Sequence, residues 1–227
     1  MAEWLNRTFY SFDSGMFHIV NNWATVAGSF LNPFFKFISF FGASGLFFII
    51  LSVVLCLFKK SRKLGGTMLL SIIVGGLFTN VILKNLVARP RPYTVDEFKP
   101  MWEMAGAITE SEYSFPSGHT TVTMVSMMSL FFICNKKWSW TGFFFVILMG
   151  LSRVYLFAHY LTDVLAGLIV GFVSGIIGYF VAKALFNMAE KNKDKKFFNF
   201  VLNFDLIGSF KKKPVTEDSD KDGNDNE

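Results

Sequence analysis

Residues 164–181 read VLAGLIVGFVSGIIGYFV, a run of 18 positions without a charged side chain. An apolar run of this length is typical of a helix that crosses a lipid bilayer, because it is long enough to span the hydrocarbon core. The run also carries Gly167, Gly171 and Gly175 at four-residue spacing. Small residues repeated in this way predict close packing against a neighbouring helix.

Further apolar runs recur along the 227 residues, of which 52% are hydrophobic. We predict five membrane-spanning helices, at residues 39–58, 66–84, 118–134, 139–157 and 163–186. Residues 11–38 are more polar in their first half, and for them we predict an amphipathic helix in the outer membrane interface, with a sixth span as the alternative. The predicted fold is therefore all-α: a polytopic transmembrane helical bundle of about five to six spans with an N-terminal interfacial helix.

Lysine clusters set the predicted orientation of this bundle. They lie in the links after the first, third and fifth predicted spans, at residues 59–63, 136–137 and 191–196. Because positively charged links stay in the cytoplasm, the stretches 85–117 and 158–162 are predicted to face outward. We expect a multi-pass protein of the cytoplasmic membrane, bacterial in composition, with its functional residues on the extracytoplasmic side.

The charge pattern also divides the chain. Residues 215–227 hold six acids and one lysine, which predicts a disordered, solvated tail. The basic excess of the remainder favours contact with anionic lipids of the bilayer, and no nucleic acid is expected as a partner. The sequence does not indicate an oligomeric state. The predicted parts are an N-terminal amphipathic or interfacial segment (1–38), a transmembrane core (39–186), a cytoplasmic juxtamembrane segment (187–209) and a disordered charged tail (210–227).

Arginine is rare in this chain, and its positions are informative. Only five of the 22 basic residues are arginine, and three of these, Arg89, Arg91 and Arg153, lie at outward-facing ends of predicted spans. A planar guanidinium binds carboxylate or phosphate through two parallel hydrogen bonds, which a lysine does not offer. These arginines therefore favour recognition of an oxyanion. The alternative is that they only reach toward lipid headgroups.

Two polar stretches adjoin these arginines. In KNLVARPRP (84–92), Lys84 and Arg91 are about two helical turns apart, so we expect them to share a helix face, and the prolines to end that helix. In SFPSGHT (114–120), Ser117 and Gly118 begin the third predicted span. The free N–H groups of a helix start, approached closely at a glycine, suit a phosphate with His119 beside it. The alternative is an ordinary helix start with an incidental histidine.

A third polar stretch, SRVYLFAHYLTD (152–163), precedes the apolar run at 164–181. Arg153 and His159 are six residues apart, which predicts a turn between two helices. His159 and Asp163 are four apart, so we expect the carboxylate to accept a hydrogen bond from one imidazole nitrogen and leave the other free to attack. The alternative is a pair that merely satisfies itself at a helix start.

All three stretches fall on the outward side of the predicted topology. Cations, backbone donors and two histidines at headgroup level indicate a site for a lipid phosphate. No cluster of acids or histidines with enough ligands for a metal is visible in the sequence, so no metal and no cofactor are expected.

In order and spacing, these stretches resemble the signature of the type 2 phosphatidic acid phosphatase superfamily: K-x6-R-P, P-S-G-H and S-R-x5-H-x3-D. The resemblance covers roughly residues 35–185. It selects Arg91 as the motif arginine, because Arg89 would need a lysine where Ile82 stands, and it leaves Arg89 as an additional cation.

The resemblance implies a membrane lipid phosphatase with a six-helix core and a phosphohistidine mechanism. By that analogy His159 is the nucleophile, Asp163 orients it, and His119 is the general acid. The implied phosphate-binding residues are Lys84, Arg91, Ser117, Gly118 and Arg153.

The motifs leave the lipid substrate open between undecaprenyl diphosphate, phosphatidylglycerophosphate and phosphatidic acid. We expect specificity to lie in a lipid-facing groove and in residues 93–115, which carry five acids and are predicted to form a lid. Two other functions remain: a phosphotransferase of the same family, and a non-catalytic protein that binds or transports an anionic lipid. The latter would not need His159 and Asp163 at their spacing.

Overall fold

The computed structural model of the chain describes residues 1–42, 45–110 and 113–206. The predicted disorder of residues 210–227 lies outside the described residues. Within the described ranges all regular structure is helical. The elements, in chain order, are α1 (Ala2–Thr8), α2 (Tyr10–Phe40), α3 (Leu46–Leu57), α4 (Arg62–Gly76), the π-helix η2 (Leu77–Leu83), α5 (Lys84–Val87), the 3₁₀-helix η3 (Pro92–Thr94), α6 (Lys99–Met104), α7 (Gly118–Ile133), α8 (Lys136–Ser139), α9 (Thr141–Tyr155), α10 (Leu161–Lys191) and α11 (Lys196–Asn203).

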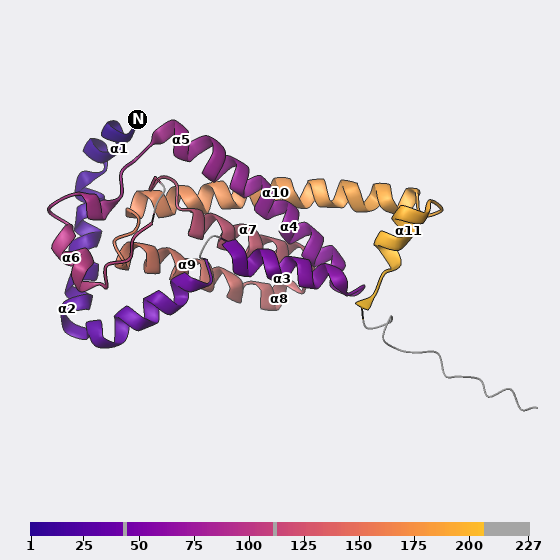
Figure 1. Cartoon of the computed structure of the whole chain (residues 1–227), viewed down its shortest axis with the longest axis horizontal. Helices are drawn as coiled ribbons and strands as arrows, with labels where there is room; N and C mark the ends of the chain where they lie inside the picture. Colours follow the sequence, from indigo (N-terminus) through magenta and orange to yellow (C-terminus); the bar gives the residue numbers. More distant parts are fainter. Residues whose placement is uncertain (43–44, 111–112, 207–227) are drawn as a thin grey trace, which may run out of the picture.

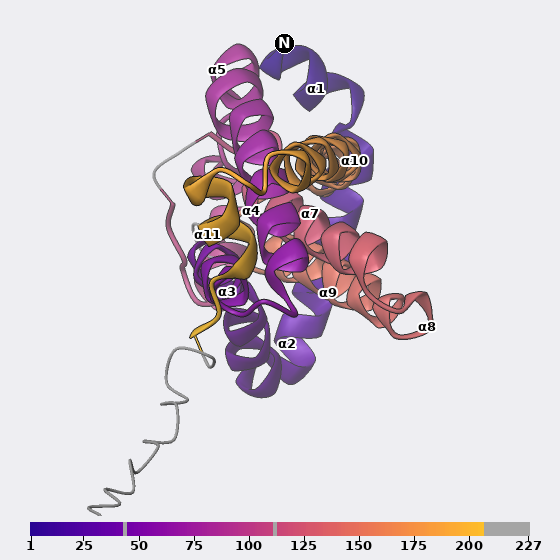
Figure 2. The ribbon, with the colours of Figure 1, turned by 90° about the vertical axis from the view of Figure 1, so that its right-hand side faces the viewer.

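Helix α10 runs along the length of the molecule, with α11 at one end and α1, α2 and α6 at the other (Figure 1). Seen from the α11 end, α3, α4, α7 and α9 gather beside α10 (Figure 2). Residues 88–110 and 113–117 lie over the opposite end, where the short turn between α9 and α10 also lies.

The glycines of α10 set its distance from α7. A Cβ on Gly167 would lie 2.7 Å from the carbonyl oxygen of Ser117, and a Cβ on Gly171 would lie 2.6 Å from the Cβ of Met124. Only glycine permits this approach, so the predicted close packing is confirmed. Because the helices touch here, the start of α7 is fixed beside the start of α10, and the Ser117 N–H donates to the Asp163 carbonyl at 3.0 Å.

Four of the five predicted spans correspond to helical segments with similar bounds. The first, predicted from residue 39, is wrong at its beginning, because α2 ends at Phe40 and α3 begins at Leu46. Gly45 directly before α3 has a left-handed backbone with φ 68°, which glycine adopts without strain. This turn separates α2 from α3.

Helix α2 is one element of 31 residues with a non-helical residue, Ala27, inside it. Its first half contributes Phe17 and Val20 to a buried cluster that includes Phe157 and Tyr160. The predicted boundary at residue 38 therefore falls inside a helix whose side chains share the core with the α9–α10 turn. Whether this segment lies in the interface or forms a sixth span stays a prediction.

Two helical stretches of the described residues are long and apolar enough by themselves to cross a membrane, residues 62–94 and 161–191. The helices Leu46–Leu57 and Gly118–Ile133 are apolar but shorter. Large apolar side chains such as Ile169 and Phe180 on α10 are exposed, as expected for contact with lipid. The count of five to six spans stays a prediction.

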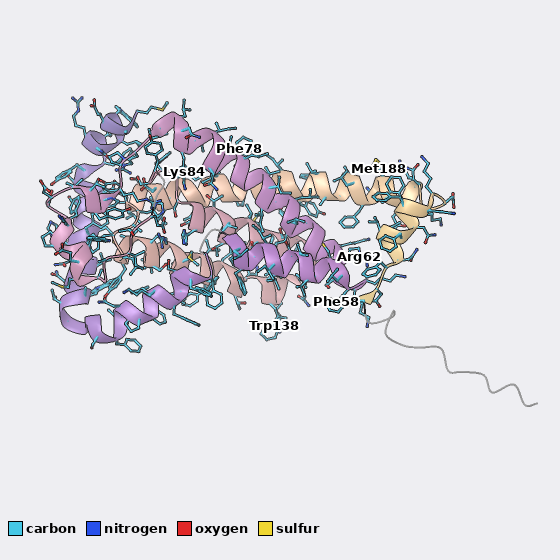
Figure 3. The ribbon with its side chains drawn as sticks, in the orientation of Figure 1. Phe58, Arg62, Phe78, Lys84, Trp138 and Met188 are labelled. Carbon is cyan, nitrogen blue, oxygen red and sulfur yellow. The ribbon has the colours of Figure 1, made fainter. Side chains whose placement is uncertain are left out.

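Arg62 ties α11 to the start of α4. Its guanidinium donates to the carbonyl oxygens of Cys56 at 3.1 Å, Leu202 at 2.6 Å and Phe204. Figure 3 places Arg62 toward the α11 end of the molecule and Lys84 far from it, toward the other end. The lysines at the start of α4 and after α10 are thus separated along the molecule from the predicted site.

Candidate active site

Three buried cations define one end of the bundle. Lys84 begins α5, Arg91 follows it in the connection to η3, and Arg153 lies in the last turn of α9, each with at most 7% of its surface exposed. The prediction that Lys84 and Arg91 share a helix face is wrong, because α5 ends at Val87 and Ala88 has a left-handed φ of 51°. Both side chains nevertheless reach the same cavity of about 570 Å³. The cavity is lined by Asn80, Lys84, Asn85, Pro90, Arg91, Tyr93, Thr94, Glu110 and Tyr113.

Lys84 follows directly on the π-helix η2, a distortion that is frequent at functional sites. The amide of Asn85 donates to the carbonyl oxygen of Val81 at 2.9 Å in this region. Lys84 approaches the start of α7 closely, since a Cβ on Gly118 would lie 3.9 Å from its Nζ. The lysine and the helix start therefore face a common space.

Ser117 and Gly118 begin α7 as predicted. The Ser117 hydroxyl is the N-cap: it accepts from the Thr120 hydroxyl at 3.0 Å and from the Thr120 N–H at 3.4 Å. His119 follows in the first turn, and a Cβ on Gly42 would lie 2.7 Å from its Cδ2. The imidazole therefore needs a glycine at position 42, a requirement that the sequence analysis missed.

His159 lies in the turn between α9 and α10, with 1% of its surface exposed. Its Nδ1 is 2.7 Å from the carbonyl oxygen of Ser114. Because a carbonyl oxygen only accepts, Nδ1 carries the proton, and the lone pair is on Nε2. Arg91 Nη1 lies 3.2 Å from that Nε2 and also donates to the Ala158 carbonyl at 2.9 Å. The imidazole is thus held in one tautomer, with its lone pair toward the cations.

Asp163 supports His159 less directly than predicted. Its Oδ2 is 3.6 Å from His159 Nδ1, so the hydrogen bond of Nδ1 goes to Ser114 instead. The reason is that His159 precedes α10, whereas Asp163 lies in its first turn and accepts the Tyr160 N–H at 3.0 Å. The expected hydrogen bond between the Asp163 carboxylate and the His159 imidazole is therefore not formed, although the two side chains remain neighbours.

Burial and the positive charges of Arg91 and Arg153 lower the pKa of His159 well below its usual value. A buried imidazolium beside guanidinium groups is unfavourable, so the imidazole is neutral at neutral pH. An unprotonated nitrogen in a cationic site is suited to attack an electrophile that carries negative charge.

Glu110 is the residue that the sequence analysis missed. Its Oε2 lies 2.8 Å from Arg91 Nη1, and its Oε1 pairs with Arg153. The Nε2 atoms of His119 and His159 each lie 3.9 Å from a different oxygen of this carboxylate. Burial by itself would raise the pKa of Glu110, but the positive charges of Arg153 and Arg91 hold it below its usual range. Glu110 is therefore a carboxylate anion that pairs with two arginines and lies close to both histidines.

Arg153 completes this arrangement. It donates to the Ser39 hydroxyl and to Glu110, while its Nε is buried without a hydrogen-bond acceptor among the described residues. A buried unpaired donor costs free energy, on the order of 1–3 kcal/mol, unless a ligand accepts from it. An acceptor atom of a ligand placed beside this Nε would satisfy it.

Glu110, His119 and His159 bring ligand atoms within 4.8 Å of one another, a grouping that could hold a metal ion. This grouping was not predicted from the sequence, because Glu110 is 49 residues from His159 along the chain. Arg91 and Arg153 contact the same carboxylate, and their positive charge opposes a divalent cation there. The donor set fits an anion better than a metal.

All eight predicted site residues thus meet at one end of the bundle. The three cations, Lys84, Arg91 and Arg153, lie near the start of α7, which carries Ser117, Gly118 and His119. His159 lies beside these residues, and Asp163 lies next to His159 on the side of its Nδ1. Together with the long apolar helices, this defines an α-helical membrane protein with a buried cluster of cations and histidines.

The PAP2 superfamily profile matches residues 64–191, more than half of the chain and every predicted site residue. The chain belongs to the PAP2 superfamily. It is 30% identical to the undecaprenyl-diphosphatase of Sulfolobus acidocaldarius over 62% of this chain and 66% of that protein. It is 27% identical to phosphatidylglycerophosphatase B of Bacillus subtilis over 73% of this chain and 80% of that protein.

Solved structures share the fold. LpxE of Aquifex aeolicus superposes with a TM-score of 0.56 at 23% identity, over 74% of this chain and 94% of that one. A transmembrane PAP2-type phosphatidylglycerolphosphate phosphatase from Bacillus subtilis gives 0.51 at 25% identity, over 81% of this chain and 88% of that one. The chain spans between about half and two thirds of the length of the first curated relatives it matches.

Proposed function

We propose that this protein is a membrane lipid phosphatase that removes the terminal phosphate of a lipid phosphate or diphosphate through a phosphohistidine. The observation that carries the proposal is the neutral, buried Nε2 of His159, which faces a site where Arg91 and Arg153 already hold a carboxylate. The names of relatives in the superfamily, undecaprenyl-diphosphatase and phosphatidylglycerophosphatase B, support the same chemistry.

In the proposed first step, the Nε2 lone pair of His159 attacks the phosphorus and the bond to the lipid oxygen breaks. His119 donates a proton to that leaving oxygen. A phosphoryl group in the position of the Glu110 carboxylate would lie near both imidazoles, since each Nε2 is 3.9 Å from a carboxylate oxygen.

In the second step, water attacks the phosphohistidine, His119 accepts the water's proton, and His159 is released with inorganic phosphate. The proton stays on His159 Nδ1 in both steps and is donated to the Ser114 carbonyl. The imidazole therefore carries a positive charge only while it is phosphorylated. The proposed phosphate ligands are Lys84, Arg91 and Arg153, together with the helix start at Ser117 and Gly118. We propose that no metal takes part.

The physiological lipid remains a choice between undecaprenyl diphosphate, phosphatidylglycerophosphate and phosphatidic acid. Phosphate release from a panel of these three lipids in detergent micelles is the direct test. A strong preference for one lipid would identify the substrate, whereas release from none would contradict the phosphatase proposal. Adding alcohol acceptors to the same assay would reveal a phosphotransferase through new phosphorylated products.

The acidic side chain in the site leads to a prediction. Because Glu110 pairs with Arg91 and Arg153, an incoming phosphate must displace it from both guanidinium groups. Glu110→Gln removes the competing charge, and we expect inorganic phosphate to inhibit this variant about tenfold more strongly, a difference of about 1.4 kcal/mol in binding. The measurement is the competitive inhibition constant of inorganic phosphate.

Glu103→Gln is the matched control, since Glu103 belongs to the same connection but is exposed. We expect the control to bind phosphate as the unchanged protein does. Weaker inhibition of Glu110→Gln by phosphate would mean that the carboxylate assists binding rather than competing with it.

We further propose five to six spans in the cytoplasmic membrane, with the site on the extracytoplasmic side and residues 187–209 in the cytoplasm. Pro100→Cys places a thiol on exposed α6, near the site, whereas the native Cys134 is exposed after α7. In intact cells, a membrane-impermeant thiol reagent is expected to label the introduced cysteine and not Cys134. Labelling of Cys134 alone would mean that the orientation is the opposite of the proposed one.

A further inference from the structure

Arg89, the extra cation outside the motif, is one of the most buried side chains of the described residues, with 1% exposed. Its guanidinium lies 2.6 Å from Asp163 Oδ1 and 2.8 Å from Asp13 Oδ2. It also donates to the Thr162 hydroxyl at 2.7 Å and to Asn6 Oδ1 at 2.7 Å. One arginine thus joins α1 and α2 to the start of α10.

The backbone of Arg89 supports the other side of His159. Its carbonyl accepts the Ser114 N–H at 2.9 Å, and the next carbonyl, of Pro90, accepts the Ser114 hydroxyl at 3.1 Å. Ser114 in turn offers the carbonyl that holds His159 Nδ1. Arg89 therefore contacts both groups that lie next to Nδ1: Ser114 through its main chain and Asp163 through its side chain.

The N-terminal segment is part of this arrangement. Asp13 has 2% of its surface exposed and accepts the Thr162 N–H at 2.9 Å and the Thr162 hydroxyl at 2.8 Å, in addition to its bond with Arg89. The ring of Tyr160 stacks 3.7 Å from the Arg89 guanidinium carbon. A planar guanidinium offers five donors in a fixed fork, which lets it bridge two carboxylates in this way.

We propose that Arg89 and Asp13 are positioning residues of the phosphatase: they hold Asp163 and Ser114 against His159 and set the charge beside its Nδ1. The inference rests on the proposed role of His159 as nucleophile. Two carboxylates share one guanidinium, so the group keeps a net negative charge next to the imidazole. That charge favours the positive phosphohistidine over the neutral resting imidazole.

Asp13→Asn tests this charge while keeping the side chain's size and one of its two acceptor oxygens. With Asp13 neutral, Arg89 compensates Asp163 alone, and the net negative charge beside Nδ1 disappears. We expect kcat to fall about tenfold, with KM and the inhibition constant of inorganic phosphate unchanged within twofold. Asn6→Ala, which removes one acceptor from Arg89, is expected to lower kcat in the same direction by a smaller factor.

A purely structural role of the group makes a different prediction. It would lower the unfolding temperature of Asp13→Asn and leave kcat per folded molecule unchanged, and this result would overturn the proposal. Asn32→Ala is the matched control, because Asn32 also joins α2 to other elements, through Tyr155 at 2.6 Å and the Met104 carbonyl at 2.8 Å, without contacting His159. We expect it to keep the kcat of the unchanged protein.

The two proposals fail in different ways. Undiminished turnover by His159→Ala would overturn the proposed function. An inactive His159→Ala together with normal kcat in both Asp13→Asn and Asn6→Ala would overturn only the positioning role. The double variant Asp13→Asn/Asp163→Asn is expected to match Asp163→Asn alone, since Asp13 acts through Asp163, and additive losses would contradict that route.

Discussion

Replacing His159 with alanine is expected to lower kcat for phosphate release from a lipid phosphate by at least about 10³-fold, because the variant lacks the Nε2 that attacks the phosphorus in the proposed first step. The backbone of the turn is held independently of the ring, since the N–H groups of Ala158 and His159 both donate to the Arg153 carbonyl. We therefore expect the variant to fold and to bind phosphate. The measurement is steady-state phosphate release in detergent.

His159→Asn sharpens this experiment. The asparagine amide can still donate to the Ser114 carbonyl near the position of Nδ1, but it places no nitrogen at the position of Nε2. It is expected to be as inactive as His159→Ala, which would assign the loss to the attacking atom rather than to the turn. His18→Ala, an exposed histidine outside the site, should keep full activity, and EDTA should leave phosphate release unchanged. Full turnover by either His159 variant would contradict a histidine nucleophile.

The order and spacing of polar residues between apolar runs were sufficient to predict most of the site. Ser117 caps α7 as predicted, because serine before a glycine and an apolar run is a strong helix-start signal. The turn before α10 follows from the six-residue separation of Arg153 and His159, which places them on different faces of a continuous helix. These features depend on residues that are close together in the chain, so the sequence pattern is enough to predict them.

The features that were not predicted depend on contacts between distant segments. Glu110 was one of five acids in a long connection, and nothing near it in the sequence distinguishes it from Glu103. Ser114 acts through its backbone carbonyl, which any residue would provide. The end of α5 was missed because Ala88 takes a left-handed backbone that alanine rarely adopts, so only the tertiary structure requires it.

The role of the N-terminal segment was hidden for a similar reason. Asp13 lies in a half-polar stretch whose pattern predicts an interfacial helix, and an acid there normally faces water. Its burial is explained by its partners Arg89, 76 residues away along the chain, and Thr162, 149 residues away. Two carboxylates and one arginine in a membrane protein interior are costly unless paired, so their pairing beside His159 is more informative than any of them alone.

His119→Ala is expected to lower kcat for lipid phosphates by about 10²–10⁴-fold, because the alkoxide leaving group then departs without a proton. The size of the loss should depend on the leaving group. p-Nitrophenyl phosphate releases a stabilised phenolate that needs no proton, so its first step should be nearly unaffected. Hydrolysis of the phosphohistidine would still be slow, because His119 also accepts the proton of the attacking water.

The two steps can therefore be separated in one variant. With p-nitrophenyl phosphate, His119→Ala should give a burst of nitrophenolate equal to the amount of enzyme, followed by slow turnover, and the phosphate should be recovered on His159. The double variant His119→Ala/His159→Ala is the control and should give no burst. Equal losses of kcat for lipid and aryl substrates, without a burst, would contradict proton donation by His119 and leave it as a phosphate ligand, since a ligand acts on every leaving group alike.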